Sequence, residues 1–298
     1  MQQLFFGHRL GLGRAPVRYL IASLAALTVL LATQAHADPL KVGVVSNGLI
    51  VDSVHEAADL AKAEGLDVEV IEFSDWVLPN TALANGDIDI NYFQHEPFLD
   101  NAEKSQGFDL VPLAYGVEGL MGLYSKTANR IDDIAPGSTI AIADDPVNQG
   151  RGLLLLQQAG LITLPADIGY HATVYDIVDN PRQLDFVELP GPQLARAYQD
   201  ADAVISYPHY IKASGVTNPA DALIFHHDDT HAFALRFVVR PDSVENPRVR
   251  QFIRLYQRAP EVRASLHQAF GDDTLYRLAW LDAGGIEDRG NVASGVTP

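Results

Sequence analysis

The sequence predicts an α/β protein of two units, each a sheet flanked by helices, arranged as two lobes around a cleft. Three observations lead to this expectation. Strand-like and helix-like segments alternate from residue 40 to residue 91. The same alternation restarts at residue 138. The chain also opens with a segment typical of exported proteins, and two α/β units in an exported chain favour a pair of lobes.

Residues 1–37 have the pattern of a secretory signal peptide. Arg9, Arg14 and Arg18 supply positive charge without an acidic residue, and a short apolar run (LIASLAALTVLLA) follows. The AHA sequence that ends at Ala37 has the small-x-small form of a cleavage site. The alternative is a membrane anchor, but the run is shorter than the roughly 20 residues that span a bilayer. We therefore expect a soluble periplasmic protein, cleaved near Ala37.

The composition is that of a globular protein, with 47% hydrophobic and 20% charged residues among 298. The formal net charge is −17, which argues against nucleic acid and anionic membrane surfaces as partners. The chain has no cysteine. Disulfides, thiol chemistry and a lipid on an N-terminal cysteine are therefore not expected.

The first unit is expected to hold a parallel sheet, because its order is β-α-β-α-β. Asp52 or Ser53 is predicted to cap the first helix, and Gly65 to end it. The predicted strands are 40–46, 67–73 and 88–91, and the predicted helices are 52–65 and 78–87.

The second unit repeats the alternation, and further elements follow it. The expected strands are 138–143, 184–189, 202–206 and 232–240, and the expected helices are 152–160, 192–201, 247–259 and 261–271. The tail 288–298 lacks periodicity and is expected to be mobile. The predicted lobes are 38–125 plus 236–298 for the first and 126–235 for the second.

Several motifs fall in one order along the chain: FSDWVLPN, FQHEPFLD, DDPVNQGRG and VELPGPQLAR. In these motifs the sequence resembles the D-methionine-binding lipoprotein (MetQ/NlpA) family, over most of residues 40–260. That family comprises substrate-binding proteins of ABC importers for methionine and related amino acids. The resemblance implies a periplasmic-binding-protein fold, with two α/β lobes, a hinge and a ligand cleft between them.

The resemblance also implies ligand-binding residues. Phe93, His95 and Phe98 match the segment that walls the family's side-chain pocket, and Asn148 and Arg151 match its D-P-x-N-x-G-R ligand residues. Three features depart from the family. Ser206 and Leu235 stand where the family has asparagines, and the lipidated cysteine is missing.

The residue types fit these roles without the resemblance. Arg151 is expected where a turn enters a helix, and a helix N-terminus with a guanidinium suits a carboxylate. The alternative is a surface arginine paired with Asp144 or Asp145. His95 has the alternative of a general base, although no nucleophile lies near it in sequence. Ser206 follows a strand end and is expected to hydrogen-bond a polar group of the ligand near the hinge.

The stretch HHDDTH is the best metal candidate, because His226, Asp228 and His231 offer nitrogen and oxygen ligands within six residues. The other interpretation is a solvated polar loop, which we favour. No G-x-S-x-G, P-loop or dinucleotide motif occurs.

The resemblance implies a binding protein that catalyses no reaction, and we expect it to need no cofactor or metal and to be a monomer. Its ligand is expected to be methionine or a related small amino acid or carboxylate. Its expected partners are an ABC permease and the ATPase of that permease, not nucleic acid. Two alternatives remain: a metal-dependent periplasmic enzyme, and a ligand-binding sensor without a transporter.

Overall fold

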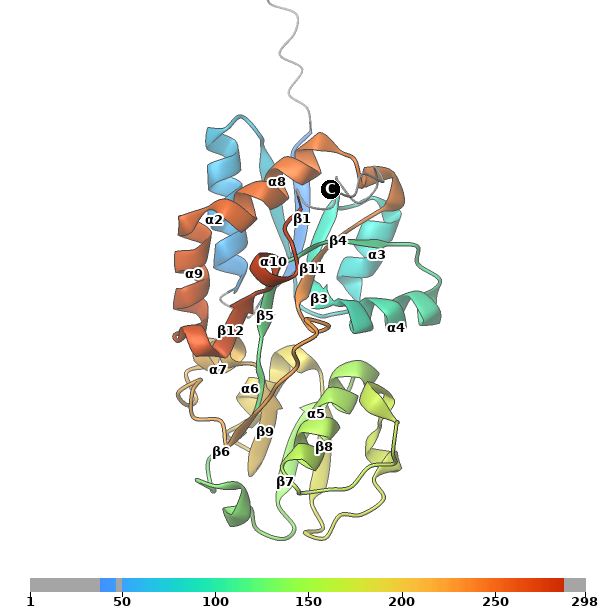
Figure 1. Ribbon diagram of the computed structural model, residues 1–298, viewed down its shortest axis with the longest axis vertical. Helices are drawn as coiled ribbons and strands as arrows, with labels where there is room; N and C mark the ends of the chain where they lie inside the picture. Colours follow the sequence, from blue (N-terminus) through green and yellow to red (C-terminus); the bar gives the residue numbers. More distant parts are fainter. Residues whose placement is uncertain (1–37, 47–49, 287–298) are drawn as a thin grey trace, which may run out of the picture. The chain divides into compact units, whose positions relative to one another are not determined.

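The computed structural model describes residues 38–46 and 50–286 (Figure 1). The predicted signal peptide, residues 1–37, and the predicted mobile tail, residues 288–298, lie outside the described residues. No helix of the described part is long and apolar enough to cross a membrane. The described residues build a mixed α/β structure with sheets flanked by helices, as the sequence predicts.

The first sheet has five strands in the order β2-β1-β3-β11-β4. Strand β1 pairs in parallel with β2 and β3, and β11 pairs antiparallel with β3 and β4. The parallel part is the predicted β-α-β-α-β unit. The strands are β1 (Leu40–Val45), β2 (Val68–Phe73), β3 (Ile90–His95), β4 (Val111–Tyr115) and β11 (Leu235–Val239).

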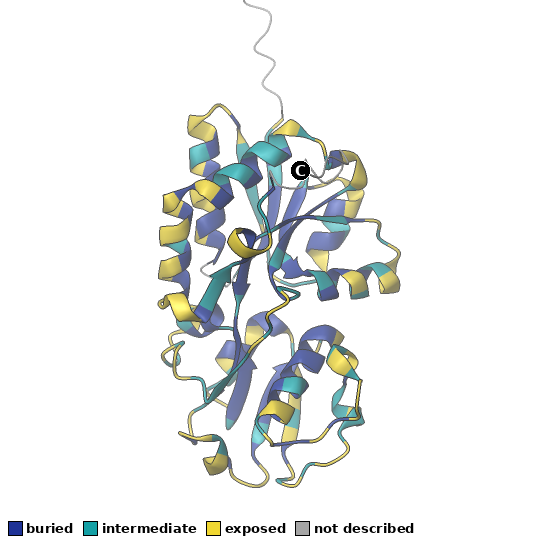
Figure 2. Ribbon diagram, viewed as in Figure 1, coloured by how far each residue is buried: buried dark blue, intermediate teal, exposed yellow. Residues whose placement is uncertain are grey.

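Helices cover both faces of the first sheet (Figure 1). One core joins the sheet to α2 (Ile50–Ala63), α8 (Pro247–Arg258) and α9 (Pro260–Phe270). On the other face, α3 (Leu78–Asn85) and α4 (Glu96–Gln106) pack over a smaller cluster. Figure 2 shows the consequence: the strands are largely buried, and exposed residues lie on the outer sides of the helices.

The second sheet also has five strands, in the order β10-β6-β9-β7-β8. Strand β7 pairs in parallel with β8 and β9, and β6 pairs antiparallel with β9 and β10. Its strands are β6 (Met121–Ser125), β7 (Thr139–Ala143), β8 (Asp185–Leu189), β9 (Ala203–Ser206) and β10 (Ile224–His226), and its helices are α5 (Pro146–Gln158), α6 (Leu194–Ala197) and α7 (Pro208–Ser214).

Within the described residues the chain passes between the sheets twice, from β4 to β6 and from β10 to β11. The first crossing contains β5 (Val117–Gly119), which pairs antiparallel with β12 (Tyr276–Leu278). The remaining elements are α10 (Ala279–Asp282) and 3-10 turns at Ile131–Asp133, Gly169–His171, Val174–Asp176, Gly191–Gln193, Pro241–Ser243 and Asp273–Leu275.

Several element boundaries differ from the prediction. Helix α2 already includes Asp52 and Ser53, so the predicted cap is wrong: the Ser53 hydroxyl donates inside the helix, to the carbonyl of Ile50 at 2.6 Å. The third strand starts at Ile90 and continues to His95. The helix predicted over 192–201 is only a 3-10 turn followed by the four residues of α6.

Helix α5 differs from the prediction in a way that affects the site. It begins at Pro146, six residues before the predicted start, because Asp145 caps it. The Asp145 carboxylate accepts from the backbone N–H of Asn148 at 2.9 Å. Arg151 therefore lies in the second turn of the helix, not at its entrance.

Candidate functional site

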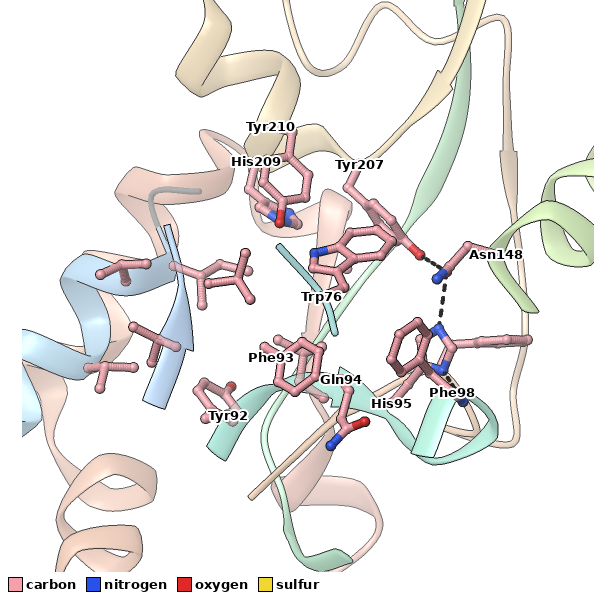
Figure 3. Close-up of a pocket in the computed structure, with 18 residues that line it drawn as sticks. Trp76, Tyr92, Phe93, Gln94, His95, Phe98, Asn148, Tyr207, His209 and Tyr210 are labelled. Carbon is pink, nitrogen blue, oxygen red and sulfur yellow. Dashed lines mark hydrogen bonds between the residues drawn. The ribbon is translucent and has the colours of Figure 1, made fainter. Parts of the chain in front are cut away.

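A cavity of about 70 Å³ is lined by strands β1, β3 and β11 of the first sheet and by helices that pack on either sheet (Figure 3). Phe93 and Phe98 come from β3 and α4, Tyr207 and Tyr210 from the start of α7, and Phe233 from the second crossing. The Phe93 and Phe98 rings meet edge to face, with centroids 6.0 Å apart. Such a wall suits an apolar or thioether side chain.

His95 joins β3 to α4 and also lines the cavity. Its Nδ1 accepts from the backbone N–H of Phe98 at 3.2 Å, so the side chain caps α4. With Nδ1 as an acceptor, Nε2 carries the proton and donates to Oδ1 of Asn148 at 3.1 Å. Burial, and secondly the charge of Arg151, lower the pKa of His95 to about 3. A pKa this far below neutral pH makes the ring a weak base, and its Nδ1 lone pair already accepts from Phe98, so His95 does not fit a general base.

Asn148 brings the two sheets together, because α5 belongs to the second sheet and His95 to the first (Figure 3). Its Oδ1 also accepts from the Tyr207 hydroxyl at 2.6 Å, and its Nδ2 donates to Asp145 at 3.0 Å. Burial raises the pKa of Asp145. The amide thus has defined partners on both ends, which fixes its orientation.

Arg151 is 1% exposed, and aromatic rings surround its charge. The guanidinium carbon lies 4.1 Å from the Phe233 ring centroid and 5.6 Å from that of Tyr207. Its hydrogen bonds, to Nδ1 of His226 and to the Tyr207 hydroxyl, are both long at 3.5 Å. Among the described ion pairs none joins it to Asp144 or Asp145. The structure therefore shows a buried cation, not a surface ion pair.

Ser206 ends β9 and is 1% exposed. Its hydroxyl has no hydrogen-bond partner in the described part of the chain, and the same holds for Nδ1 of the nearby His209. His209 lines the cavity, and burial lowers its pKa to about 3. Leu235, which stands where the family has an asparagine, is also part of the cavity wall.

The structure thus brings Phe93, His95, Phe98 and Asn148 together on the cavity wall. Arg151 lies behind that wall, against Tyr207 and Phe233. Ser206 is buried at the end of β9, directly before the wall residue Tyr207 in sequence, and does not itself line the cavity.

Sequence reasoning assigned no ligand role to three other aromatic residues of the wall: Trp76, Tyr92 and Phe233. It did place Tyr207 and Tyr210, with Ser206, just past a strand end, where α/β sheets bind ligands. The same signal existed for Trp76, which follows the carboxyl end of β2.

The three residues of the metal candidate have separate partners. His226 lies beside Arg151, and burial lowers its pKa to about 4. Asp228 accepts from the Thr230 hydroxyl at 2.8 Å. Nδ1 of His231 lies 2.7 Å from Oε2 of Glu118. In the ranges that the structure describes, no group of three or more histidines and carboxylates is placed to hold a metal ion.

Known proteins resemble this chain over most of its length. A model of the NlpA lipoprotein family matches residues 40–277. The chain is 38% identical over 229 residues to the D-methionine-binding lipoprotein MetQ of Escherichia coli (strain K12), which covers 75% of this chain and 84% of that protein.

Solved structures are similar over a comparable span. A crystal structure titled as the methionine-binding protein MetQ has a TM-score of 0.73 and 37% identity, covering 78% of this chain and 95% of that one. A nutrient-binding protein from Burkholderia cenocepacia, bound to methionine, has a TM-score of 0.71 and 36% identity, covering 78% and 97%.

Proposed function

The chain belongs to the NlpA lipoprotein family, and from this membership we propose that it is the substrate-binding protein of an ABC importer. Its ligand is methionine or a closely related small amino acid. The relatives named above are binding proteins for methionine, and they support this assignment. The observation that carries the proposal is a buried arginine that no described carboxylate pairs with, behind an aromatic cavity lined by the first sheet and by helices of both α/β units.

Arg151 supplies the charge that holds the ligand carboxylate. A buried guanidinium without an anion is costly, and a carboxylate that reaches it relieves this cost. Its present contacts at 3.5 Å are weak enough to be exchanged for a bidentate pair. Asn148, already oriented by Asp145, adds a polar contact beside it.

Phe93, His95 and Phe98 contact the ligand side chain. Their rings form the apolar part of the wall, and the neutral His95 contributes no charge to it. A thioether packs well against aromatic edges. Ser206, whose buried hydroxyl has no partner among the described residues, exchanges a hydrogen bond with a polar group of the ligand near the hinge.

Binding works through closure of two lobes, which correspond to residues 38–125 plus 236–298 and residues 126–235. A ligand that touches residues from both sheets stabilises the closed form by its differential affinity. The His95–Asn148 hydrogen bond between the sheets supports this view. The two crossing segments form the hinge, where Glu118 of one bonds His231 of the other.

The remaining features of the proposal follow from the family. The protein catalyses no reaction and acts as a monomer that delivers its ligand to a permease with its ATPase. It works in the periplasm after removal of residues 1–37. The Escherichia coli relative is a lipoprotein, whereas the present sequence contains no cysteine.

Isothermal titration of the purified protein tests the function. The protein is first unfolded and refolded, which removes ligand retained during purification. L-methionine and D-methionine are then titrated, with methioninol, which lacks the carboxylate, as the matched control. We expect methionine to bind and methioninol to bind at least tenfold more weakly, since a hydrogen bond to a charged group contributes roughly 1.5–3 kcal/mol. The proposal would be contradicted if neither methionine enantiomer binds, or if methioninol binds as tightly as methionine.

A further inference from the structure

Gly191 stands at a place where the backbone does not require glycine. It opens the 3-10 turn after β8 and is buried. Its φ does not lie in the positive range that favours glycine. A Cβ added there would nevertheless lie only 2.6 Å from Cζ2 of Trp76, and closer still to Cη2 and Cζ3. The reason for glycine is therefore the space that the indole occupies.

Trp76 belongs to the first α/β unit, whereas Gly191 belongs to the second. It lies in the loop between β2 and α3, whereas Gly191 follows β8 of the second sheet. The indole packs against the core cluster of the second sheet, and its ring lies 6.5 Å from that of Tyr210. On its own side it meets Phe98 edge to face at 6.2 Å. Figure 3 shows the indole among these aromatic residues at the cavity, which it also lines.

The loop that carries Trp76 is held in place from within. The Asp75 carboxylate accepts from the backbone N–H groups of Val77 and Leu78, at 2.7 and 2.8 Å. These bonds fix the backbone on the side of Trp76 where α3 begins. The indole of Trp76 thus extends from a hydrogen-bonded loop, lines the cavity and packs against the core cluster of the second sheet.

We propose that Gly191 is a positioning residue for the closed form. Because it has no side chain, the Trp76 indole can pack directly on its backbone and close the cavity. We call this contact the seat of Trp76. This proposal rests on the proposed function, because closure matters through ligand binding. It adds that ligand affinity depends on a residue that touches no ligand. Any side chain at position 191 holds the indole away, and the closed form loses population relative to the open one.

A double-mutant cycle tests the seat. Gly191→Ala is compared with Trp76→Phe and with the double variant, by titration with L-methionine. We expect Gly191→Ala alone to weaken binding about tenfold, within the usual cost of overpacking. The shorter Phe ring does not reach the added methyl group, so Gly191→Ala should have little further effect in the Trp76→Phe background. Equal effects of Gly191→Ala in both backgrounds would overturn the proposal.

Fluorescence gives a readout that a merely structural role would not move. The chain has two tryptophans, so Trp280→Phe leaves Trp76 as the single emitter. Acrylamide quenching of Trp76 is measured with and without L-methionine. We expect methionine to protect Trp76 in this parent, and Gly191→Ala to remove the protection and to raise quenching without ligand. Pro190→Ala, in the same loop, is the control and should behave like the parent.

The outcomes separate the two proposals. If the parent binds no methionine, the proposed function fails, and the ligand-free comparison of quenching still decides whether Gly191 seats the indole. In another outcome, the parent binds methionine and its Trp76 is protected from quenching, but the Gly191→Ala variant binds equally well and its Trp76 is equally well protected. The proposal for Gly191 is then wrong, and the proposed function stands. Equal thermal unfolding of the ligand-free variants excludes a general folding defect.

Discussion

Two buried arginines in this protein have opposite surroundings. Arg236 on β11 is 3% exposed, is paired with Glu96 and lies with its guanidinium carbon 3.4 Å from the Tyr115 ring centroid. Arg151 on α5 is 1% exposed, and no described carboxylate pairs with it. At Arg236 the fold supplies an anion, although Nε and Nη1 have no hydrogen-bond partner among the described residues. At Arg151 the described residues supply long hydrogen bonds but no anion. A buried charge that the fold itself does not neutralise is expected where a ligand completes the site.

The largest effect is expected at Arg151. Replacing Arg151 by Met, which is similar in length and uncharged, should weaken methionine binding by about 100-fold, or about 3 kcal/mol. The same change should leave the ligand-free protein as stable as before or more stable, because it removes a buried charge without breaking an ion pair. Titration calorimetry and urea unfolding measure the two effects. A large loss of stability in Arg151→Met would show that the fold itself depends on the Arg151 charge, contrary to the contrast drawn with Arg236.

A smaller effect is expected at Arg236. The change Glu96→Ala leaves Arg236 buried without its anion and so imitates the surroundings of Arg151. We expect the free energy of unfolding to fall by about 2 kcal/mol, less than for a fully buried pair because the Glu96 side chain is 44% exposed. Asp132→Ala, at an exposed surface pair, is the control and should change stability by less than about 0.5 kcal/mol. Equal losses in both variants would mean that burial of Arg236 does not matter.

The smallest effect is a pH dependence of stability, which arises from His95 near Arg151. Burial lowers the pKa of His95 to about 3, whereas an unfolded histidine titrates near 6.5. The unfolded chain therefore binds the extra proton first, and stability is lost as pH falls from 6.5 towards 3. The buried His95 should therefore lower the free energy of unfolding by about 1 kcal/mol between pH 7 and pH 5.5. Urea unfolding at both pH values should show a loss that is smaller by this amount in His95→Asn.

His209 provides a second test of the same effect, since burial lowers its pKa to about 3 as well. His209→Asn should reduce the acid loss by a similar amount. If neither substitution changes the difference in stability between pH 7 and pH 5.5, the histidines near the cavity are not held neutral by burial.

Local sequence determined much of the fold. The alternation of strand and helix patterns gives the parallel pairing of β1 with β2 and β3, and Gly86 ends α3 in the left-handed conformation expected of a helix stop. Phe93, His95 and Phe98 were assigned to one wall through the resemblance of their segment to the family, and they line one cavity in the structure. The first two features depend on backbone preferences and on neighbours within a few residues, which the sequence displays directly.

Tertiary structure decided what depends on distant segments. Strand β11 lies between β3 and β4, although more than 100 residues separate it from either, and no local pattern shows that insertion. The HHDDTH stretch looks like a ligand set in sequence, yet its side chains have different partners because His231 has a positive φ and bonds Glu118. The neutral state of His95, the missing carboxylate at Arg151 and the seat of Trp76 on Gly191 were likewise invisible. Each depends on burial and on contacts across the cavity, and those exist only once both sheets are packed.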